Sequence, residues 1–132
     1  MTMQMAELIR VSKGSVAISG EPLAYPNSPD PEMTASIMPI PPGGKTEWMT
    51  HPVPAYVYIL EGELTVEFAA DASCQKFKAG EGFIQARSAW HRGRNDGQTE
   101  MRFLAVFSGA KEVPNVLHPP KGTAINSESG KR

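Results

Sequence analysis

Residues 56–68 read YVYILEGELTVEF, and this stretch decides the fold class. Its first five residues are aromatic or aliphatic, a composition that favours a β-strand. The Glu61-Gly62 pair that follows is typical of a tight turn. Beyond the turn, apolar and polar side chains alternate, so one face of a second strand is apolar. That face carries Leu64, Val66 and Phe68. The stretch therefore predicts two strands joined by a tight turn.

Strand signals of the same kind continue on both sides of this stretch. None of the 12 prolines lies between Ala55 and Val113, and proline interrupts strand pairing, so paired strands are expected there. We predict short strands at residues 35–40, 45–51, 56–60, 63–68, 74–77, 83–86 and 99–107. Turn signals at roughly 8–12-residue spacing are typical of an antiparallel sandwich or barrel. Because no long helical periodicity is present, the predicted fold class is all-β with almost no helix.

The length and composition of the chain limit the classes of protein to which it can belong. A chain of 132 residues is expected to form one domain, over residues 1–122, with an N-terminal arm (1–33), a core (35–110) and a flexible polar tail (123–132). The 13 basic and 14 acidic side chains give a net charge of −1, which argues against nucleic acid or a membrane surface as partner. No apolar run has the length of a membrane span and no secretory signal is seen, so we expect a cytoplasmic protein. The single cysteine, Cys74, excludes an internal disulfide, and we interpret it as a strand residue rather than as a nucleophile.

Two longer segments carry a more specific pattern. Residues 41–64 read PPGGKTEWMTHPVPAYVYILEGEL, and residues 80–95 read GEGFIQARSAWHRGRN. The residues that carry this pattern, in this order, are Gly44, His51, Tyr58, Leu60 and Gly62 in the first segment and Gly80, His91 and Asn95 in the second. In this order the sequence resembles the two motifs of the cupins, and specifically a small single-domain cupin of the cupin-2 type. The resemblance implies an antiparallel β-barrel of two facing sheets, a double-sheet jelly roll.

The sequence departs from the family pattern at the metal site. That pattern has a His-x-His pair and a glutamate in the first motif and a histidine in the second. Aligning the chain on Tyr58 puts Met49 at the first histidine and Ala55 at the glutamate. The resemblance therefore implies a degenerate metal site, with His51, His91 and Met49 as the candidate ligands.

The three candidate ligands determine which metals are expected. Met49 and His51 share one face of a strand by its two-residue period, and the resemblance places His91 on a neighbouring strand. Two imidazoles and a thioether suit one divalent transition metal, namely zinc, nickel, copper or iron, although this set lacks the carboxylate of a mononuclear iron(II) site. Glu47 has the same parity and is a candidate for that carboxylate. The alternative is that the histidines are hydrogen-bonded pocket residues and that there is no metal. In either case the predicted ligand pocket consists of Met49, His51, Tyr58 and His91.

Other side chains near the motifs have two interpretations each. By parity, Trp48 and Trp90 face away from the site and belong to an outer face or a subunit interface. Arg87, Arg92 and Arg94 form a basic cluster in the sequence around His91, which either holds a carboxylate substrate or is a solvated strand face.

Three function classes remain open from the sequence. The first is a small metal-dependent enzyme with oxygenase, isomerase or lyase chemistry on a small molecule, which the resemblance implies. The second is a non-catalytic module that binds a small ligand and has lost the family metal. The third is an interaction scaffold, since one fold hosts many functions.

The N-terminal region predicts a homodimer. Residues 5–19 contain two apolar stretches, AELIRV and SVAIS, which look like strands too short to stand alone. An unpaired strand edge promotes association, and the resemblance implies that such segments pair with a partner's sheet.

Overall fold

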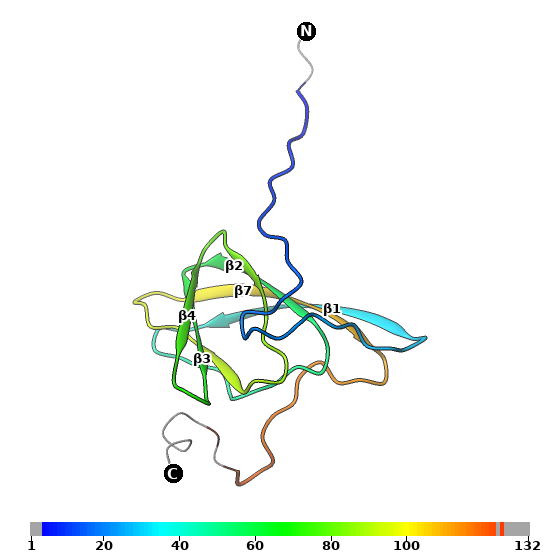
Figure 1. Cartoon of the computed structure of the whole chain (residues 1–132). Coiled ribbons are helices and arrows are strands. Elements are labelled where there is room, and N and C mark those ends of the chain that lie inside the picture. Colours follow the sequence, from blue (N-terminus) through cyan, green and yellow to red (C-terminus); the bar gives the residue numbers. More distant parts are fainter. Residues whose placement is uncertain (1–3, 124, 126–132) are drawn as a thin grey trace.

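The computed structural model describes residues 4–123 and residue 125, and the described residues form seven strands and no helix (Figure 1). The strands are β1 (Pro31–Ile40), β2 (Ala55–Glu61), β3 (Glu63–Phe68), β4 (Cys74–Lys78), β5 (Gly82–Ile84), β6 (His91–Arg94) and β7 (Met101–Ala110). The all-β prediction is confirmed. Of the polar tail predicted at 123–132, residue 124 and residues 126–132 lie outside the described residues. No helix in the described part of the chain has the length and hydropathy needed to cross a membrane.

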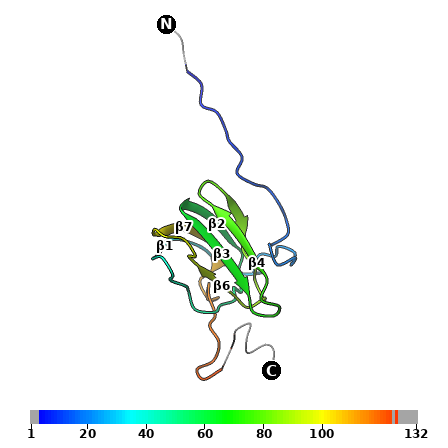
Figure 2. The same cartoon turned by 90° about the vertical axis from the view of Figure 1, so that its left-hand side faces the viewer.

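The strands form two antiparallel sheets. One contains four strands in the order β1-β7-β2-β5, and the other contains three in the order β4-β3-β6 (Figure 2). The tight turn at Glu61-Gly62 connects β2 to β3 and so carries the chain from one sheet to the other. Gly62 has a φ of 78° there, and a Cβ at this position would lie 2.7 Å from the Cβ of Met101. Only glycine combines this backbone conformation with so close an approach.

The core lies between the two sheets. The inner row of β2 consists of Ala55, Val57 and Ile59, and the inner row of β3 consists of Leu64, Val66 and Phe68, all of them buried. This confirms the face that the alternation in β3 predicts. Thr65 and Glu67, on the other face of β3, are also buried. That outer face is therefore covered, and the Glu67 carboxylate there binds Arg92 and Arg94.

The largest departure from the predicted strands is at residues 45–51. In place of a continuous strand, Lys45 pairs with Arg94 and Met49 pairs with His91. Four steps along one segment thus match three steps along β6, and such an extra residue is a β-bulge. At the other end of β6, the Asn95 side chain donates to the carbonyls of Ile40 and Thr99 and so ties the turn together. The Thr99 carbonyl is bonded to this side chain, and β7 begins at Met101 rather than at residue 99.

The two apolar stretches of the N-terminal region have different environments. The second stretch, SVAIS at residues 15–19, folds back on its own chain: Val16 pairs with Pro22, and the Ile18 amide donates to the Ile84 carbonyl. This stretch therefore has hydrogen-bond partners within its own chain. The first stretch lies in the part of the chain that projects away from the two sheets (Figures 1 and 2).

Candidate functional site

Two histidines from opposite motifs meet inside the fold. The Nε2 atom of His51 lies 3.1 Å from the Nε2 atom of His91. The ring centroids are 4.9 Å apart and the ring planes are tilted by 46°. Both residues are buried, with 5% of His51 and 1% of His91 exposed. The structure thus brings together the two histidines that the sequence nominates, although they are 40 residues apart.

Strand pairing sets the direction of the His91 ring. His91 is the first residue of β6 and pairs with Phe68 of β3 on one side. On its other side it exchanges two backbone hydrogen bonds with Met49, at 2.9 and 3.1 Å. Directly opposed residues in antiparallel strands project to the same face. Met49 therefore shares the face of His91, as the sequence predicts.

His51 is positioned by the segments on either side of it. Its amide donates to the carbonyl of Arg87, at 2.8 Å, which ties residue 51 to the corner after β5. Its Nδ1 atom lies 3.0 Å from the carbonyl oxygen of Asn115. Asn115 belongs to the segment that follows β7, which we name the C-terminal strap (residues 111–118). Leu117 of this strap pairs with Thr50 through two backbone hydrogen bonds.

The hydrogen bonds of the two rings assign their protons. The Nδ1 atom of His91 lies 2.8 Å from the carbonyl oxygen of Ala89, as that of His51 lies near Asn115. A carbonyl only accepts, so each Nδ1 carries the hydrogen and donates it. In the neutral rings both Nε2 atoms then carry lone pairs, and these lone pairs face each other. Such a contact is favourable only when a proton or another cation lies between the two nitrogens.

The surroundings of the pair keep both rings neutral. The Phe107 ring lies 5.4 Å from that of His51, and the Phe68 ring lies 6.4 Å from that of His91. Burial, together with the nearby His91, lowers the pKa of His51 to about 4, although the hydrogen bond to Asn115 opposes the shift. Burial also lowers the pKa of His91, although the hydrogen bond to Ala89 opposes that shift. At neutral pH the site therefore offers two unprotonated Nε2 atoms.

This donor set fits a transition metal with nitrogen and sulfur ligands. A separation of 3.1 Å lets both Nε2 atoms reach one ion at the ~2.0–2.1 Å typical of imidazole ligands. An Nδ1–H donated to a carbonyl is the usual support of a metal-ligating histidine. Within residues 4–123 and 125, no group of three or more His, Cys, Asp or Glu side chains is arranged to hold a metal. Met49, which pairs with His91 and shares its face, is the candidate for a third ligand that the sequence nominates.

Two further predicted participants lie elsewhere. The Glu47 side chain is 81% exposed and lies 3.5 Å from the Nδ1 atom of His118. The bulge between residues 45 and 49 breaks the parity that placed Glu47 beside Met49, so Glu47 supplies no carboxylate to the histidine pair. Tyr58 is half-buried on the face of β2 opposite to Val57 and Ile59. The structure therefore does not bring Tyr58 into the expected pocket.

The arginines near His91 do not act as one cluster. Arg92 and Arg94 each bind Glu67 at 2.9 Å, and the Arg92 guanidinium lies 4.2 Å from the centre of the Trp48 ring. Trp48 thus faces away from the histidines, as its parity predicts. Arg87 donates to the carbonyl of Pro52 instead, at 3.0 Å. Arg92 and Arg94 therefore pair with Glu67, whereas Arg87 binds the backbone just after His51.

Two further residues shape the site, and no sequence pattern selects them. Asn115 accepts from His51 through its backbone and donates to Thr34 Oγ1 through its side chain. Glu21 accepts from the amides of Arg87 and Ser88, and despite partial burial these and its other hydrogen bonds lower its pKa to about 2. It thereby fixes the corner that precedes His91. Both residues are far in sequence from the groups they contact, and no local pattern marks them.

Comparisons with known proteins place the fold. The family model described as "Cupin domain" matches residues 36–107, more than half of the chain. A cupin 2 domain-containing protein from Halorhodospira halophila is similar in structure, with a TM-score of 0.57 and 19% identity, over 72% of this chain and 63% of that one. An oxalate oxidase structure gives a TM-score of 0.57 and 22% identity, over 71% of this chain and 51% of that one.

A study of the Mn(II) centres of Bacillus subtilis oxalate decarboxylase provides a third similar structure, with a TM-score of 0.55 and 20% identity, over 65% of this chain and 23% of that one. The chain spans less than two thirds of the length of each of these three structures. At these identities the likeness concerns the fold alone. No curated protein matches the sequence significantly. From the match to residues 36–107 and from its two facing sheets, the chain belongs to the cupin domain family.

Proposed function

We propose that this cupin binds a small molecule through one divalent transition metal ion held by the Nε2 atoms of His51 and His91. The observation that supports the proposal is that the two Nε2 atoms lie 3.1 Å apart while each Nδ1–H donates to a backbone carbonyl. Met49 supplies a thioether from the segment paired with His91. The donor set suits zinc, nickel or copper, because no carboxylate joins it.

Each group of the site has a distinct part in this proposal. The carbonyls of Asn115 and Ala89 hold the rings in the tautomer that leaves Nε2 free. Phe68 and Phe107 exclude water and keep the local dielectric low, which strengthens electrostatic interactions at the site. When bound, the ion would act as a Lewis acid on an oxygen of the small molecule.

The reaction class is proposed by analogy. Two of the structurally similar proteins are an oxalate oxidase and an oxalate decarboxylase. In its enzymatic form, this proposal is oxygenase, isomerase or lyase chemistry on a small molecule. Fold-level analogy alone supports that form.

A non-catalytic binding module is the second candidate. It is favoured by Ala55, which is 4% exposed on the inner row of β2, where the family pattern has a glutamate. With no carboxylate among the donors, the site has lost a group that family chemistry uses. In this form the ligand binds at the histidine pair without turnover.

The experiment is elemental analysis of the purified full chain, followed by calorimetric titration with zinc, nickel and copper. One equivalent of metal is expected, and His51→Ala or His91→Ala should weaken its binding at least about tenfold. His118→Ala is the matched control, because this third histidine is half-exposed and lies beside Glu47. If no metal binds after reconstitution, or if His118→Ala loses as much metal affinity as the two test variants, the histidine pair does not hold a metal. The non-catalytic binding module then remains.

The proposal includes the assembly and location expected from the sequence. We propose that the working form is a homodimer in the cytoplasm. Light scattering of the full chain tests the first part.

A further inference from the structure

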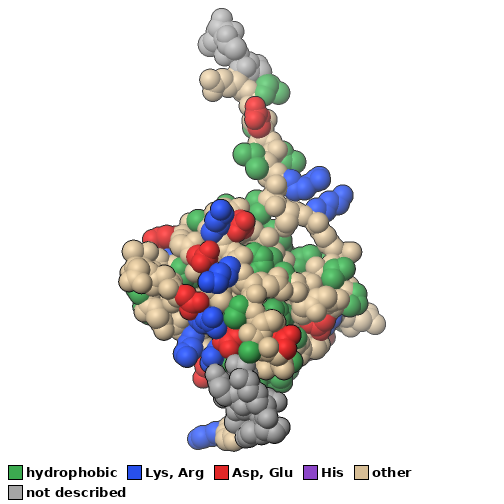
Figure 3. Space-filling model, turned by 60° about the vertical axis from the view of Figure 1, so that its left-hand side comes forward, with side chains coloured by type: hydrophobic (Ala, Val, Ile, Leu, Met, Phe, Trp, Pro, Cys, Tyr) green, Lys and Arg blue, Asp and Glu red, His purple; other side chains and the backbone are tan. Residues whose placement is uncertain are grey.

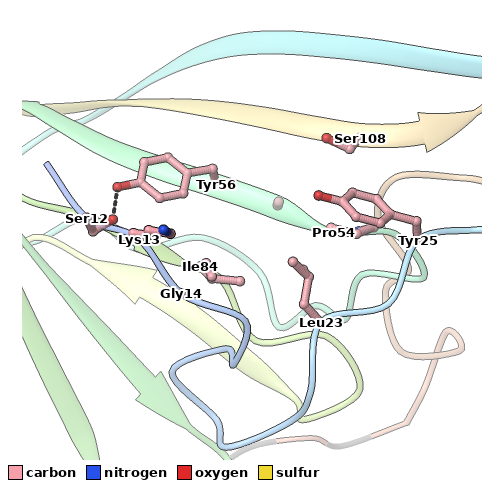
Figure 4. A pocket seen from close by; sticks show the side chains of 10 residues that line it. Ser12, Lys13, Gly14, Leu23, Tyr25, Pro54, Tyr56, Ile84 and Ser108 are labelled. Atoms are coloured by element: carbon pink, nitrogen blue, oxygen red, sulfur yellow. Dashed lines mark hydrogen bonds between the residues drawn. The ribbon is translucent and has the colours of Figure 1, made fainter. Parts of the chain in front are cut away.

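Gln85 lies on the inner side of the four-stranded sheet, directly after β5. Its backbone amide donates to the carbonyl of Ala55 at 2.9 Å, which continues the pairing of Tyr56 with Ile84 by one step. Figure 4 shows Tyr56 and Ile84 on the outer side of the sheet, where they line a groove of about 280 Å³. Phe83, two residues before Gln85, is part of the core. Since successive side chains of a strand alternate, Gln85 projects inward beside Ala55.

The row that contains Gln85 faces the histidine pair. Ala55 pairs with Phe107, and Phe107 pairs with Thr34, so the four residues form one row across the inner side of the sheet. The Phe107 ring lies 5.4 Å from the ring of His51. In this row only the small Ala55 side chain stands between Gln85 and Phe107. Gln85 is therefore a neighbour of the site on the side where the family pattern has its glutamate.

The Gln85 side chain is buried and only partly hydrogen-bonded. The residue is 8% exposed. Its Oε1 atom accepts from the backbone amide of Ala86 at 2.9 Å. Because a backbone amide only donates, this contact assigns the oxygen, and the other terminal atom is the nitrogen. Within residues 4–123 and 125, the Nε2 atom has no hydrogen-bond partner. Buried polar groups in proteins are normally paired, so an unused NH₂ donor at this position calls for an acceptor.

Arg87 brings a positive charge to the same corner. Its Nη2 atom donates to the carbonyl of Pro52 at 3.0 Å, while its buried Nε atom has no partner among the described residues. On the face seen in Figure 3, by contrast, charged side chains of both signs lie next to one another. The Glu21 carboxylate at this corner accepts from the backbone amides of Arg87 and Ser88. No salt bridge joins the Arg87 guanidinium to an acidic side chain in the described part of the chain. This uncompensated charge favours an anionic acceptor.

We propose that Gln85 is a specificity-determining residue, whose Nε2 atom donates to an oxygen of a small carboxylate bound beside His51 and His91. This inference rests on the proposed small-molecule site and names the chemical class that the site takes. A carboxylate has two oxygens, so one can accept from Gln85 while the other faces the histidine pair. The charge of Arg87 selects the anion over a neutral molecule of the same shape. A molecule without an acceptor leaves the buried donor unpaired and is rejected.

Acetate is the probe for this assignment. Nuclear magnetic resonance follows the side-chain NH₂ signals of the ¹⁵N-labelled full-length chain during acetate titration at constant pH and ionic strength. The titration is performed on zinc-loaded and on metal-free protein. We expect the Gln85 signals to shift saturably. Gln85→Met keeps the length of the side chain and removes both N–H groups, so it should weaken acetate binding about tenfold. The backbone signals of residues 85–88 report this affinity in every variant.

Gln75→Met is the matched control. Gln75 projects from β4, and its Nε2 atom already donates to the carbonyl of Ile18 at 2.9 Å. Its amide is therefore not free to bind acetate. The Gln75→Met variant should bind acetate as tightly as the unchanged protein. Both variants should show the same β-sheet circular dichroism as that protein.

The outcomes separate this inference from the metal. A saturable shift that Gln85→Met weakens and Gln75→Met leaves unchanged supports Gln85 as the donor. The same result in a chain that binds no zinc supports Gln85 and contradicts the metal site. If acetate leaves the Gln85 signals in place in both forms, Gln85 is not the donor. The assignment is equally wrong if Gln85→Met keeps full acetate affinity or if both variants lose the same affinity. In these last cases zinc binding at the histidine pair would still stand.

Discussion

The Nε2 atoms of His51 and His91 lie 3.1 Å apart, while the Nδ1 atom of each ring donates to a backbone carbonyl. Two acceptors face each other in a buried, largely apolar environment. A shared cation removes their repulsion, and neutral imidazoles bind a transition metal readily. The degenerate motif therefore still provides two imidazole donors suited to a transition metal.

The first prediction concerns stability and pH. Burial lowers the pKa of His51 to about 4 in the folded chain, from ~6.5 in the unfolded chain. Between these values the unfolded state binds more protons, so stability is full above pH ~6.5 and is lost as the pH falls toward 4. For His51 alone the free energy of unfolding should fall by about 2 kcal/mol from pH 7 to pH 5. Urea unfolding at both pH values measures this difference, and His51→Gln should reduce it.

The second prediction restores the family ligands. Met49→His should strengthen zinc binding about tenfold, because it adds an imidazole on the face that His91 shares. Ala55→Glu adds a carboxylate from the inner row of β2. Because Ala55 is buried, this carboxylate should lower the stability of the chain when no metal is bound. Calorimetric titration and thermal unfolding separate the two effects. Unchanged zinc affinity in the double variant would count against metal chemistry at this pocket.

The third prediction makes Asn115 and Thr34 positioning residues for His51. The Asn115 side chain donates to Thr34 Oγ1 at 3.0 Å and so fixes the carbonyl that accepts from His51. Thr34→Val removes the acceptor and should cost about 1 kcal/mol of stability. It should also shift the ¹⁵N resonances of His51 away from the Nδ1–H tautomer. Thr34→Ser keeps the hydroxyl and should retain the wild-type spectrum, and identical spectra in both variants would refute the positioning role.

The fourth prediction separates the arginine contacts from the site. Glu67 is buried on the outer side of β3 and binds Arg92 and Arg94. Glu67→Gln should lower the free energy of unfolding by about 2 kcal/mol, because two guanidinium groups lose a charged partner. Metal affinity should stay unchanged, since these contacts lie on the opposite side of the sheet from His91. A parallel loss of metal affinity would show that the two regions are coupled.

Local patterns in the sequence predict the fold better than they predict the site. Alternation in 63–68 identifies the inner face of β3, and motif order selects His51 and His91. The two-residue period predicts the wrong side for Glu47, because one extra residue in a bulge reverses the alternation of side chains. Tyr58 is misplaced because both rows of β2 are apolar, so alternation alone does not tell which row is buried. Asn115 is 64 residues from His51, and only the return of the C-terminal strap brings them together.

X-ray absorption spectroscopy of the full-length protein, loaded with one equivalent of copper or zinc, tests directly whether His51 and His91 bind a metal. Imidazole rings give distinctive multiple scattering, so the spectrum counts them. Two imidazole ligands are expected at ~2.0–2.1 Å, with a sulfur scatterer from Met49 that Met49→Leu removes. A first shell of oxygen alone, with no imidazole scattering, would contradict the assignment of His51 and His91 as the metal ligands.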